Sequence, residues 1–433
     1  MLEPVTVGYI GVGVLIVLLF AGVHIGIVMG LIGVLGMAYL SGWGAGLGIL
    51  RTVPYSTFAS YDFSVIPLFI LMGEFCFHGD ISGDLYQTAH KFFGRLRGGL
   101  AMATIGACAA FAAVCGSGIA TAATMTTVAL PEMRKYKYNI GLATGTLAAG
   151  GTIGILIPPS VIMIIYAMIT QQSIGALFLA GFIPGILQAV MFVGIIGFLC
   201  WRNPDLGPSG PSSTWTEKLK SLKNTWIVIV LFLLVIGGIY FGWFSPTAGA
   251  GIGAIGAFLF ALARRKLGWR KFKESLLSAT TTSAMIFFII LGAMLMSYFL
   301  AVTQLPAALS NLVNGLDISP YIIWFFVVIL YLFLGCLMDE IGMLLLTVPI
   351  LYPLMIGMGF DPIWFGIMVV IVCEMGMIVP PVGMNVFVIK GMAPDVPTYA
   401  IYRGILPFLY MDLLEIIVLT AFPVVVLWLP QVL

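Results

Sequence analysis

The sequence predicts an all-α polytopic membrane protein made of inverted structural repeats, with two re-entrant helical hairpins and two helices broken at Pro-Pro. Three observations predict this fold class. Of the 433 residues, 61% are apolar and only 8% are charged. The apolar residues form long runs, which suit membrane helices rather than alternating strands. Proline and glycine landmarks of the first half recur in the second half at an offset of 222 to 223 residues.

The composition indicates that lipid is the main solvent of this chain. The mean hydropathy is +1.13 and the net charge is +2. This chain has too few polar side chains to cover the surface of a soluble globule of its size. A cytosolic enzyme, a nucleic-acid-binding protein and a disordered chain are therefore excluded. The six cysteines show no CxxC or CxxH spacing, so neither a disulfide framework nor a metal site is indicated.

The apolar runs predict the helical segments of the chain. They span residues 5–22, 24–41, 63–79, 99–131, 139–171, 175–200, 225–244, 246–264, 275–302, 320–356, 362–393 and 397–430. The semi-polar segments 48–61, 82–97 and 303–315 favour interfacial arm helices over full crossings.

The basic residues predict which ends of these runs are cytoplasmic. Four clusters fall within residues 91–97, 134–137, 202–223 and 264–273, and the positive-inside rule assigns all four to the cytoplasm. The run 99–131 lies between the first two clusters, and a straight helix of its 33 residues would be roughly 50 Å long. We therefore expect a re-entrant hairpin that turns within CGSGIATAAT. The alternative is an ordinary span beside one misplaced basic cluster.

The internal repeat predicts an inverted arrangement. Pro131 pairs with Pro353, Pro158-Pro159 with Pro380-Pro381, and the first hairpin with residues 321–353. The first half makes an odd number of crossings, so the second half begins on the opposite side. Inverted repeats with broken helices are typical of secondary transporters, whose site lies near the midplane. In a chain so rich in glycine and proline, chance is the alternative source of this match.

Five regions follow from the repeat, the runs and the polar linker. They are the scaffold helices of repeat 1 (1–62), the arm helix, hairpin and transport helices of repeat 1 (63–200), a cytoplasmic linker (201–224), the scaffold helices of repeat 2 (225–273), and the arm helix, hairpin and transport helices of repeat 2 (274–433).

Four motifs are the candidate site: GSGIAT, GGTIGILIPPS, MDEIG and EMGMIVPPVGMN. Glycine and proline in each motif free backbone carbonyls from the helical ladder, which a membrane tolerates only toward protein or a water-filled cavity. Free carbonyls with Ser, Thr or Asn oxygens suit a small hard cation such as Na⁺. The N-termini of half-helices suit a carboxylate or sulfonate.

Asp339 and Glu340 are carboxylates in an otherwise uncharged apolar stretch. Such groups are costly in a membrane and functional by default. Neighbouring residues on a helix point about 100° apart, so we expect only one of the two to face the site, and we favour Asp339 as a cation ligand. A hairpin tip without chemistry is the alternative. Glu374 is a further candidate. Glu74, Asp412 and Glu415 lie near estimated span ends, where contact with headgroups or another subunit suffices to explain them.

The ordered set GSGIATAATM, GGTIGILIPPS, CLMDEIGMLLLTVPILYP and EMGMIVPPVGMN resembles the large membrane subunit (M, or DctM type) of tripartite ATP-independent periplasmic (TRAP) transporters. The resemblance covers the whole chain. It implies a sodium-coupled symporter that works as an elevator, with a transport domain that slides against a scaffold. It also implies one Na⁺ site per repeat. The residues implied for Na⁺ are Gly116, Ser117, Gly118 and Gly154 in the first repeat, and Asp339, Gly376, Pro380 and Gly383 in the second.

The substrate is expected between the hairpin tips. The residues assigned to it are Thr121, Pro158, Pro159, Ser160, Glu374, Pro381 and Asn385. Typical substrates of the family are small organic anions. From 274 to 389 the chain has no Lys or Arg, which leaves anion recognition to helix dipoles, hydroxyl groups and Na⁺ itself. Na⁺ is the expected coupling ion, and no organic cofactor is expected.

The family also implies partners and a location. The expected partners are a small four-helix membrane subunit, expected here as a separate chain, and a periplasmic substrate-binding protein, with the lipid bilayer of the bacterial inner membrane around them. A stand-alone ion-coupled organic-anion symporter or exchanger of the same architecture is the alternative. An intramembrane enzyme built on Asp339 and Glu340 is disfavoured, because no His, Cys or further buried carboxylate has a fitting helical spacing near them.

Overall fold

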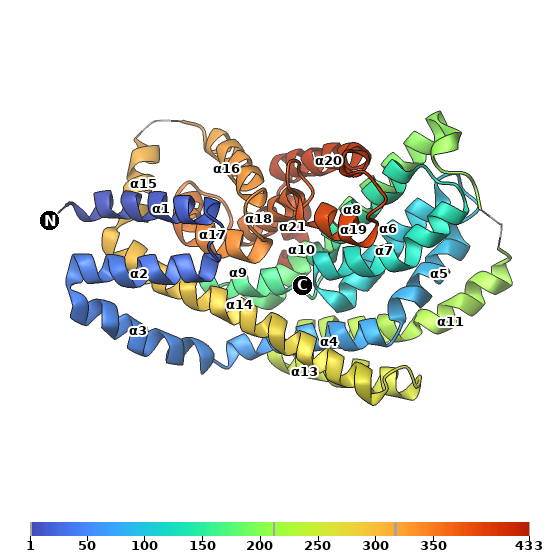
Figure 1. The fold of residues 1–433 in the computed structure, drawn as a ribbon, viewed down its shortest axis with the longest axis horizontal. Coiled ribbons are helices and arrows are strands. Elements are labelled where there is room, and N and C mark those ends of the chain that lie inside the picture. Colours follow the sequence, from blue (N-terminus) through green and yellow to red (C-terminus); the bar gives the residue numbers. More distant parts are fainter. Residues whose placement is uncertain (1, 211–212, 316–317, 433) are drawn as a thin grey trace.

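Helices make up all the regular structure in the described part of the chain (Figure 1). The computed structural model describes residues 2–210, 213–315 and 318–432. The first half contains α1 (Pro4–Phe20), α2 (Ile25–Ser41), α3 (Trp43–Phe58), η1 (Asp62–Ser64), α4 (Val65–His78), α5 (Ile81–Phe93), α6 (Gly99–Cys115), α7 (Gly118–Lys135), α8 (Ile140–Leu156), α9 (Val161–Thr170) and α10 (Ile174–Arg202).

The remaining elements begin within the linker and continue through the second half. They are η2 (Pro204–Leu206), α11 (Trp215–Phe232), the π-helical turn η3 (Leu233–Gly237), α12 (Gly238–Tyr240), α13 (Pro246–Ala263), α14 (Trp269–Thr303), α15 (Leu305–Asn314), α16 (Pro320–Gly335), α17 (Glu340–Gly357), α18 (Pro362–Gly376), α19 (Met384–Met392), α20 (Thr398–Ala421) and α21 (Val424–Val432).

Within the described residues, five helices are long and apolar enough to cross a membrane, and the number rises to eight if each of three bent helix pairs forms one span. The five are α10, α13, α14, α17 and α20. One bent pair is α3 with η1 and α4, which turn by 56°, and another is α8 with α9, which turn by 41°. These helices confirm the predicted class of multi-pass helical membrane protein.

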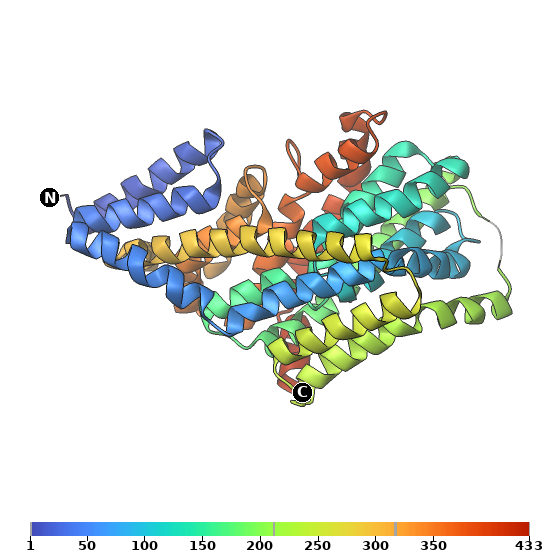
Figure 2. The same cartoon turned by 60° about the horizontal axis from the view of Figure 1, so that its bottom comes forward.

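One helix, α14, is longer than the other helices of the described residues and crosses much of the molecule. It has 35 residues, and Figures 1 and 2 show it running through the structure with α2 and α3 beside one end and α4 and α13 beside the other. Glycines let α2 approach it closely: a Cβ on Gly33 would lie 2.5 Å from the carbonyl carbon of Leu295, and Gly292 packs on the carbonyl of Gly26. Small residues at helix crossings are the usual device for close packing in membranes.

Several helix boundaries differ from the sequence predictions. α11 begins at Trp215, inside the predicted linker, because Thr214 and Glu217 form a capping box there. Residues 211–212 of that linker lie outside the described residues. The predicted run 397–430 is two helices, α20 and α21, and the predicted arm segment 48–61 is mostly part of α3.

Ion pairs fasten several helix ends. Arg264, after α13, pairs with Asp84 of α5, and Lys266 pairs with Asp80 at 3.1 Å. Arg134 of α7 binds both carboxylate oxygens of Asp395, at 3.0 and 2.9 Å. This last pair joins the first half of the chain to the loop between α19 and α20.

Candidate functional site

The first helix break lies at Gly116 and Ser117, between α6 and α7. Gly116 ends α6 with a φ of +64°, a backbone conformation that residues other than glycine rarely adopt. Ser117 caps α7, and its Oγ accepts a hydrogen bond from the backbone N–H of Ala120 at 3.4 Å. The predicted turn within residues 115–124 therefore falls at its first residues, and the rest of that segment is helix α7.

This tip packs against the first Pro-Pro break. A Cβ on Gly116 would lie 2.6 Å from the carbonyl oxygen of Pro159. A Cβ on Gly154 would lie 2.8 Å from Thr121 Oγ1 and 3.1 Å from the carbonyl oxygen of Ser117. The absence of side chains at these two glycines thus lets the tip pack closely on the break, with backbone and hydroxyl oxygen atoms at both contacts.

The first break itself is buried. Pro158 and Pro159 are joined by a cis peptide bond, and Ser160 caps α9 by accepting a bond from the N–H of Met163 at 3.5 Å. All three residues are buried. Gly118 also belongs to this contact, because a Cβ there would lie 3.1 Å from the carbonyl oxygen of Gly151. The structure therefore brings together the residues predicted for the first half, except Pro158, which makes no direct contact with the tip among those described above.

The second helix break ends at Asp339, which caps α17. Its Oδ2 accepts a hydrogen bond from the backbone N–H of Gly342 at 3.3 Å. Asp339 therefore occupies the position in its tip that Ser117 occupies in the first. Asp339 is half-buried, whereas Glu340 is only 8% exposed and its Oε2 has no partner among the described residues. Glu340 is thus the more buried of the two carboxylates, and the expectation that Asp339 is the one that faces the site stays a prediction.

The second tip also meets its own break. A Cβ on Gly335 would lie 2.5 Å from Cα of Gly376. The Cys336 thiol donates to the carbonyl oxygen of Pro380 at a sulfur–oxygen distance of 3.7 Å. Gly383 has a φ of +60° and lies against the carbonyl of Met377. Gly376 and Gly383 therefore pack on their own tip and break, and the Asp339 carboxylate bonds within its own helix.

The second break is more open than the first. Pro380 and Pro381, which are also joined by a cis peptide bond, are both exposed. The Tyr402 hydroxyl of α20 donates to the carbonyl oxygens of Pro381 and Val382, at 2.5 and 2.7 Å. Tyr402 holds the carbonyl groups of this break, and sequence reasoning missed it because nothing in the sequence places α20 beside the break.

Asn385 joins the two halves of the chain. Its side-chain Nδ2 donates to the carbonyl oxygen of Ala148 in α8 at 3.1 Å, and the residue is fully buried. The other side-chain atom, Oδ1, has no partner among the described residues. A Cβ on Gly151 would lie 2.8 Å from this amide. An amide from the second break therefore reaches the helix that leads to the first break.

Glu374 lies inside the protein, away from the exposed part of the second break. It is fully buried and neither carboxylate oxygen has a partner among the described residues. Its charge interacts with Asp412, Glu415 and Glu340. Asp412 and Glu415 are 1% and 0% exposed, so the interpretation that they face headgroups is wrong. The sequence feature that indicates their burial is their spacing: Asp412 and Glu415 are three residues apart and so share one face of an apolar helix.

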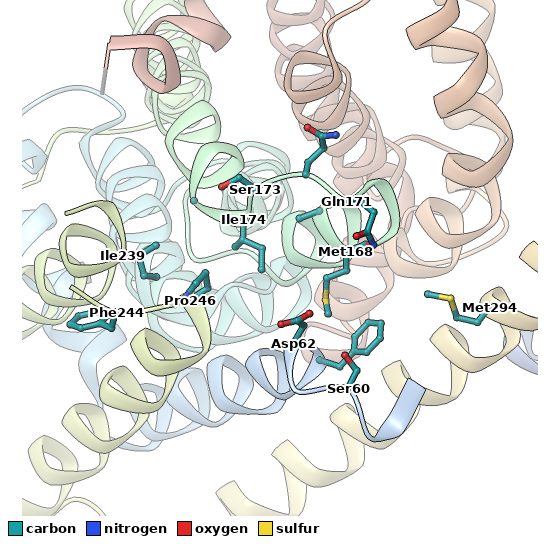
Figure 3. Close-up of a pocket in the computed structure, with 14 residues that line it drawn as sticks. Ser60, Asp62, Met168, Gln171, Ser173, Ile174, Ile239, Phe244, Pro246 and Met294 are labelled. Atoms are coloured by element: carbon teal, nitrogen blue, oxygen red, sulfur yellow. The ribbon is translucent and has the colours of Figure 1, made fainter. Parts of the chain in front are cut away.

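A cavity of about 540 Å³ lies elsewhere, between the α9–α10 turn and the residues of η1, α13 and α14 (Figure 3). Its polar lining comes from Ser60, Asp62, Gln171, Gln172 and Ser173. The residues predicted for Na⁺ and substrate are absent from its lining. Among the described residues, no group of three or more His, Cys, Asp or Glu has the arrangement of a metal site.

Comparison with known proteins identifies the family of the chain. Residues 12–425 match the family described as "Tripartite ATP-independent periplasmic transporter, DctM component". The chain belongs to this family. It is 35% identical over 378 residues to the C4-dicarboxylate TRAP transporter large permease protein DctM of Pseudomonas aeruginosa, covering 87% of this chain and 88% of that one.

Two further comparisons extend this result. The chain is 31% identical over 373 residues to the sialic acid TRAP transporter large permease protein SiaM of Vibrio cholerae, covering 86% of this chain and 87% of that one. Its fold is similar to that of the Alcanivorax borkumensis YdaH transporter, with a TM-score of 0.56, 14% identity and coverage of 88% of both chains. The protein is thus an integral inner-membrane transport protein, and its relatives are permeases rather than enzymes.

Proposed function

We propose that this TRAP permease carries out sodium-coupled uptake of a small organic anion, a carboxylate or a sulfonate, by an elevator mechanism. The observation that carries this proposal is that each helix tip meets its own Pro-Pro break, Gly116 at Pro159 and Cys336 at Pro380. Asn385 then links the second break to the helix of the first. Two broken-helix sites joined in this way suit a carrier with two related ion sites.

The helix order supports inverted repeats with two re-entrant hairpins. The hairpin of the first half is α6 and α7, followed by α8, the break, α9 and α10. The second half repeats this order as α16, α17, α18, the break, α19 and α20. The two caps, Ser117 and Asp339, are 222 residues apart, as are the two Pro-Pro pairs. An odd number of crossings in the first half makes the second half inverted.

Sodium coupling rests on the oxygen atoms at the tips. In the first repeat, the carbonyl of Ser117 and the hydroxyl of Thr121 face the bare Cα of Gly154. In the second, Asp339 provides a carboxylate at the start of α17. Carbonyl, hydroxyl and carboxylate oxygens are the ligands that hard cations prefer. The anion would lie near Ser160 and Asn385, where the N-terminus of α9 provides partial positive charge.

The partners follow from the tripartite family. We propose that a small four-helix membrane subunit and a periplasmic binding protein complete the transporter, and that the binding protein delivers the anion. The names of the two relatives above mention a C4-dicarboxylate and sialic acid, which together indicate anionic substrates of very different size.

Reconstitution tests this proposal. The protein and a small four-helix subunit are placed in proteoliposomes, a periplasmic binding protein of the family is added outside, and uptake of radiolabelled succinate, sialic acid and a sulfonate is followed. We expect uptake of one of these anions that requires an inward Na⁺ gradient and the binding protein. A K⁺ gradient of the same size is the control. Uptake that is independent of Na⁺ would contradict the proposal, and uptake without a binding protein or small subunit would favour a stand-alone symporter or exchanger.

A further inference from the structure

Helices α10, α18 and α20 enclose polar side chains that the proposed ion and anion sites do not use. Gln188 of α10 is 1% exposed, and Asp412 and Glu415 of α20 are 1% and 0% exposed. Asp412 and Glu415 are three residues apart, so they lie on the same face of α20. Carboxylates buried inside a membrane protein are costly, and nearly always have a function and a partner.

These three side chains have more hydrogen-bond acceptors than donors. Gln188 Nε2 donates to Asp412 Oδ1 at 3.1 Å. In the described part of the chain, Asp412 Oδ2, both oxygens of Glu415 and Gln188 Oε1 have no partner. The unpartnered amide oxygen of Gln188 is independent of the two acids and indicates that a donor belongs here, because buried polar atoms are rarely left without a partner.

The surrounding charges are all of one sign. Asp412 and Glu415 lie within electrostatic range of each other and of Glu374 of α18, and Glu374 also lies within electrostatic range of Glu340 of α17. No basic side chain in the described residues binds any of these acids. Other titratable groups on the packed helices have partners elsewhere: Tyr166 on the carbonyl of Pro362, Tyr331 on Thr347, and Lys390 on the carbonyls of Pro394 and Val396. Cys373 lies beside Glu340 and Glu374.

A proton is the ligand that fits this arrangement. Two adjacent carboxylates that are buried without a cation cannot both stay ionised, and a shared proton relieves the repulsion. A proton on one acid also creates the missing O–H donor. Asp412 already accepts a bond from Gln188, which stabilises its ionised form, whereas both oxygens of Glu415 lack a donor. Glu415 is therefore the acid that carries the proton.

We propose that Gln188, Asp412 and Glu415 form a buried proton-binding site in which Glu415 holds the proton. A proton on Glu415 supplies this cluster with an O–H donor, and Asp412 Oδ2 and Gln188 Oε1 are the acceptors without a partner among the described residues. The proton comes from water and returns to water, and no other bond forms or breaks. Glu374 of α18 is the neighbouring carboxylate, and α18 leads to the second break. Binding or release of the proton at Glu415 therefore changes the charge next to α18.

Infrared spectroscopy of the full-length protein in lipid membranes tests the site, since a protonated carboxylic acid has a carbonyl stretch separate from that of a carboxylate. The variant is Glu415→Gln, whose amide keeps the shape and a donor. We expect the wild type at neutral pH to show the protonated band and the variant to lose one proton equivalent of it. The matched control is Glu274→Gln, which removes a half-exposed carboxylate paired with Arg270 at 3.3 Å and should leave the band unchanged.

Two results would overturn the proposal. One is a Glu415→Gln spectrum whose protonated band equals that of the wild type. The other needs no variant, and so remains informative if Glu415→Gln does not fold: the wild type is prepared with ¹³C-labelled glutamate carboxyl groups. A protonated band that shifts with the label supports a protonated glutamate, and one that does not shift rules out a proton on Glu415.

Discussion

The two tip-and-break pairs are built alike but differ in charge and in exposure. The first pair is neutral and buried: Ser117 caps its helix, and Pro158 and Pro159 lie inside the protein. The second pair is acidic and open: Asp339 takes the cap position, Glu340 is buried behind it, and Pro380 and Pro381 are exposed. The same backbone device therefore supports two different electrostatic environments, and access to one break does not imply access to the other.

The largest expected effect tests the close packing of the first pair. Gly116→Ala should lower the free energy of unfolding by about 1–3 kcal/mol, because its Cβ would press on the Pro159 carbonyl. Thermal unfolding in detergent measures this. The matched control is Gly242→Ala, whose φ of +68° is similar but which has open space around it, so it reports backbone strain of roughly 1 kcal/mol alone. Equal losses in the two variants would show that the Gly116–Pro159 contact adds nothing.

The next effect tests the difference in charge. Asp339→Asn keeps a good helix cap, since Asn and Asp are equivalent there, but removes the carboxylate. Na⁺ at one hundred times its Kd should raise the stability of the wild type by about 2.7 kcal/mol for each occupied site, and the variant should lose that response at the second site. The measurement is the shift in Tm between Na⁺ and choline buffers. Ser117→Ala is the counterpart in the neutral pair, where a smaller loss is expected. An unchanged response of Asp339→Asn removes this carboxylate from the site.

A smaller effect tests the openness of the second break. Tyr402→Phe removes the hydroxyl that binds the carbonyls of Pro381 and Val382, with a cost of about 0.5–1.5 kcal/mol. Hydrogen–deuterium exchange should rise in peptides that cover residues 377–390 and stay constant in those that cover 150–165. Tyr399→Phe, an exposed tyrosine on the same helix, is the control. Faster exchange in both peptides would mean that the two breaks are coupled through α20.

The smallest effect concerns the ion pair between the halves. Arg134 lowers the pKa of the exposed Asp395. The contribution of this pair to stability is present above the pKa of an Asp carboxyl in the unfolded chain, about 3.9. It is lost as the pH falls through the lower pKa that Asp395 has in the folded protein. Asp395→Asn should therefore reduce Tm slightly at pH 7 and low salt, and have no effect at pH 2 or at high salt, since the pair is exposed. Asp205→Asn, on an exposed turn, is the control. A loss of the same size at pH 2 would exclude the ion pair as its cause.

The sequence predicts the breaks well because they depend on local chemistry. Glycine, proline and a capping Ser or Asp specify where a helix ends, and the structure ends α6 at Gly116 and begins α17 after Asp339 accordingly. What the sequence cannot specify is which side chains from distant helices meet. Tyr402 on the second break, Asn385 on Ala148 and Gln188 on Asp412 all depend on how α20, α19 and α10 pack. The deeper burial of Glu340 compared with Asp339 also depends on how the helices pack.

The contrast between α14 and the pair α3 and α4 has a geometric consequence. α14 is one uninterrupted helix of 35 residues, whereas the axis of α3 and that of η1 with α4 differ by 56°. The cavity of Figure 3 lies at this bend, and its lining includes Ser60, Asp62 and Phe63 beside the bend and Met294 of α14. The shape of the cavity therefore depends on the angle at which α3 meets α4.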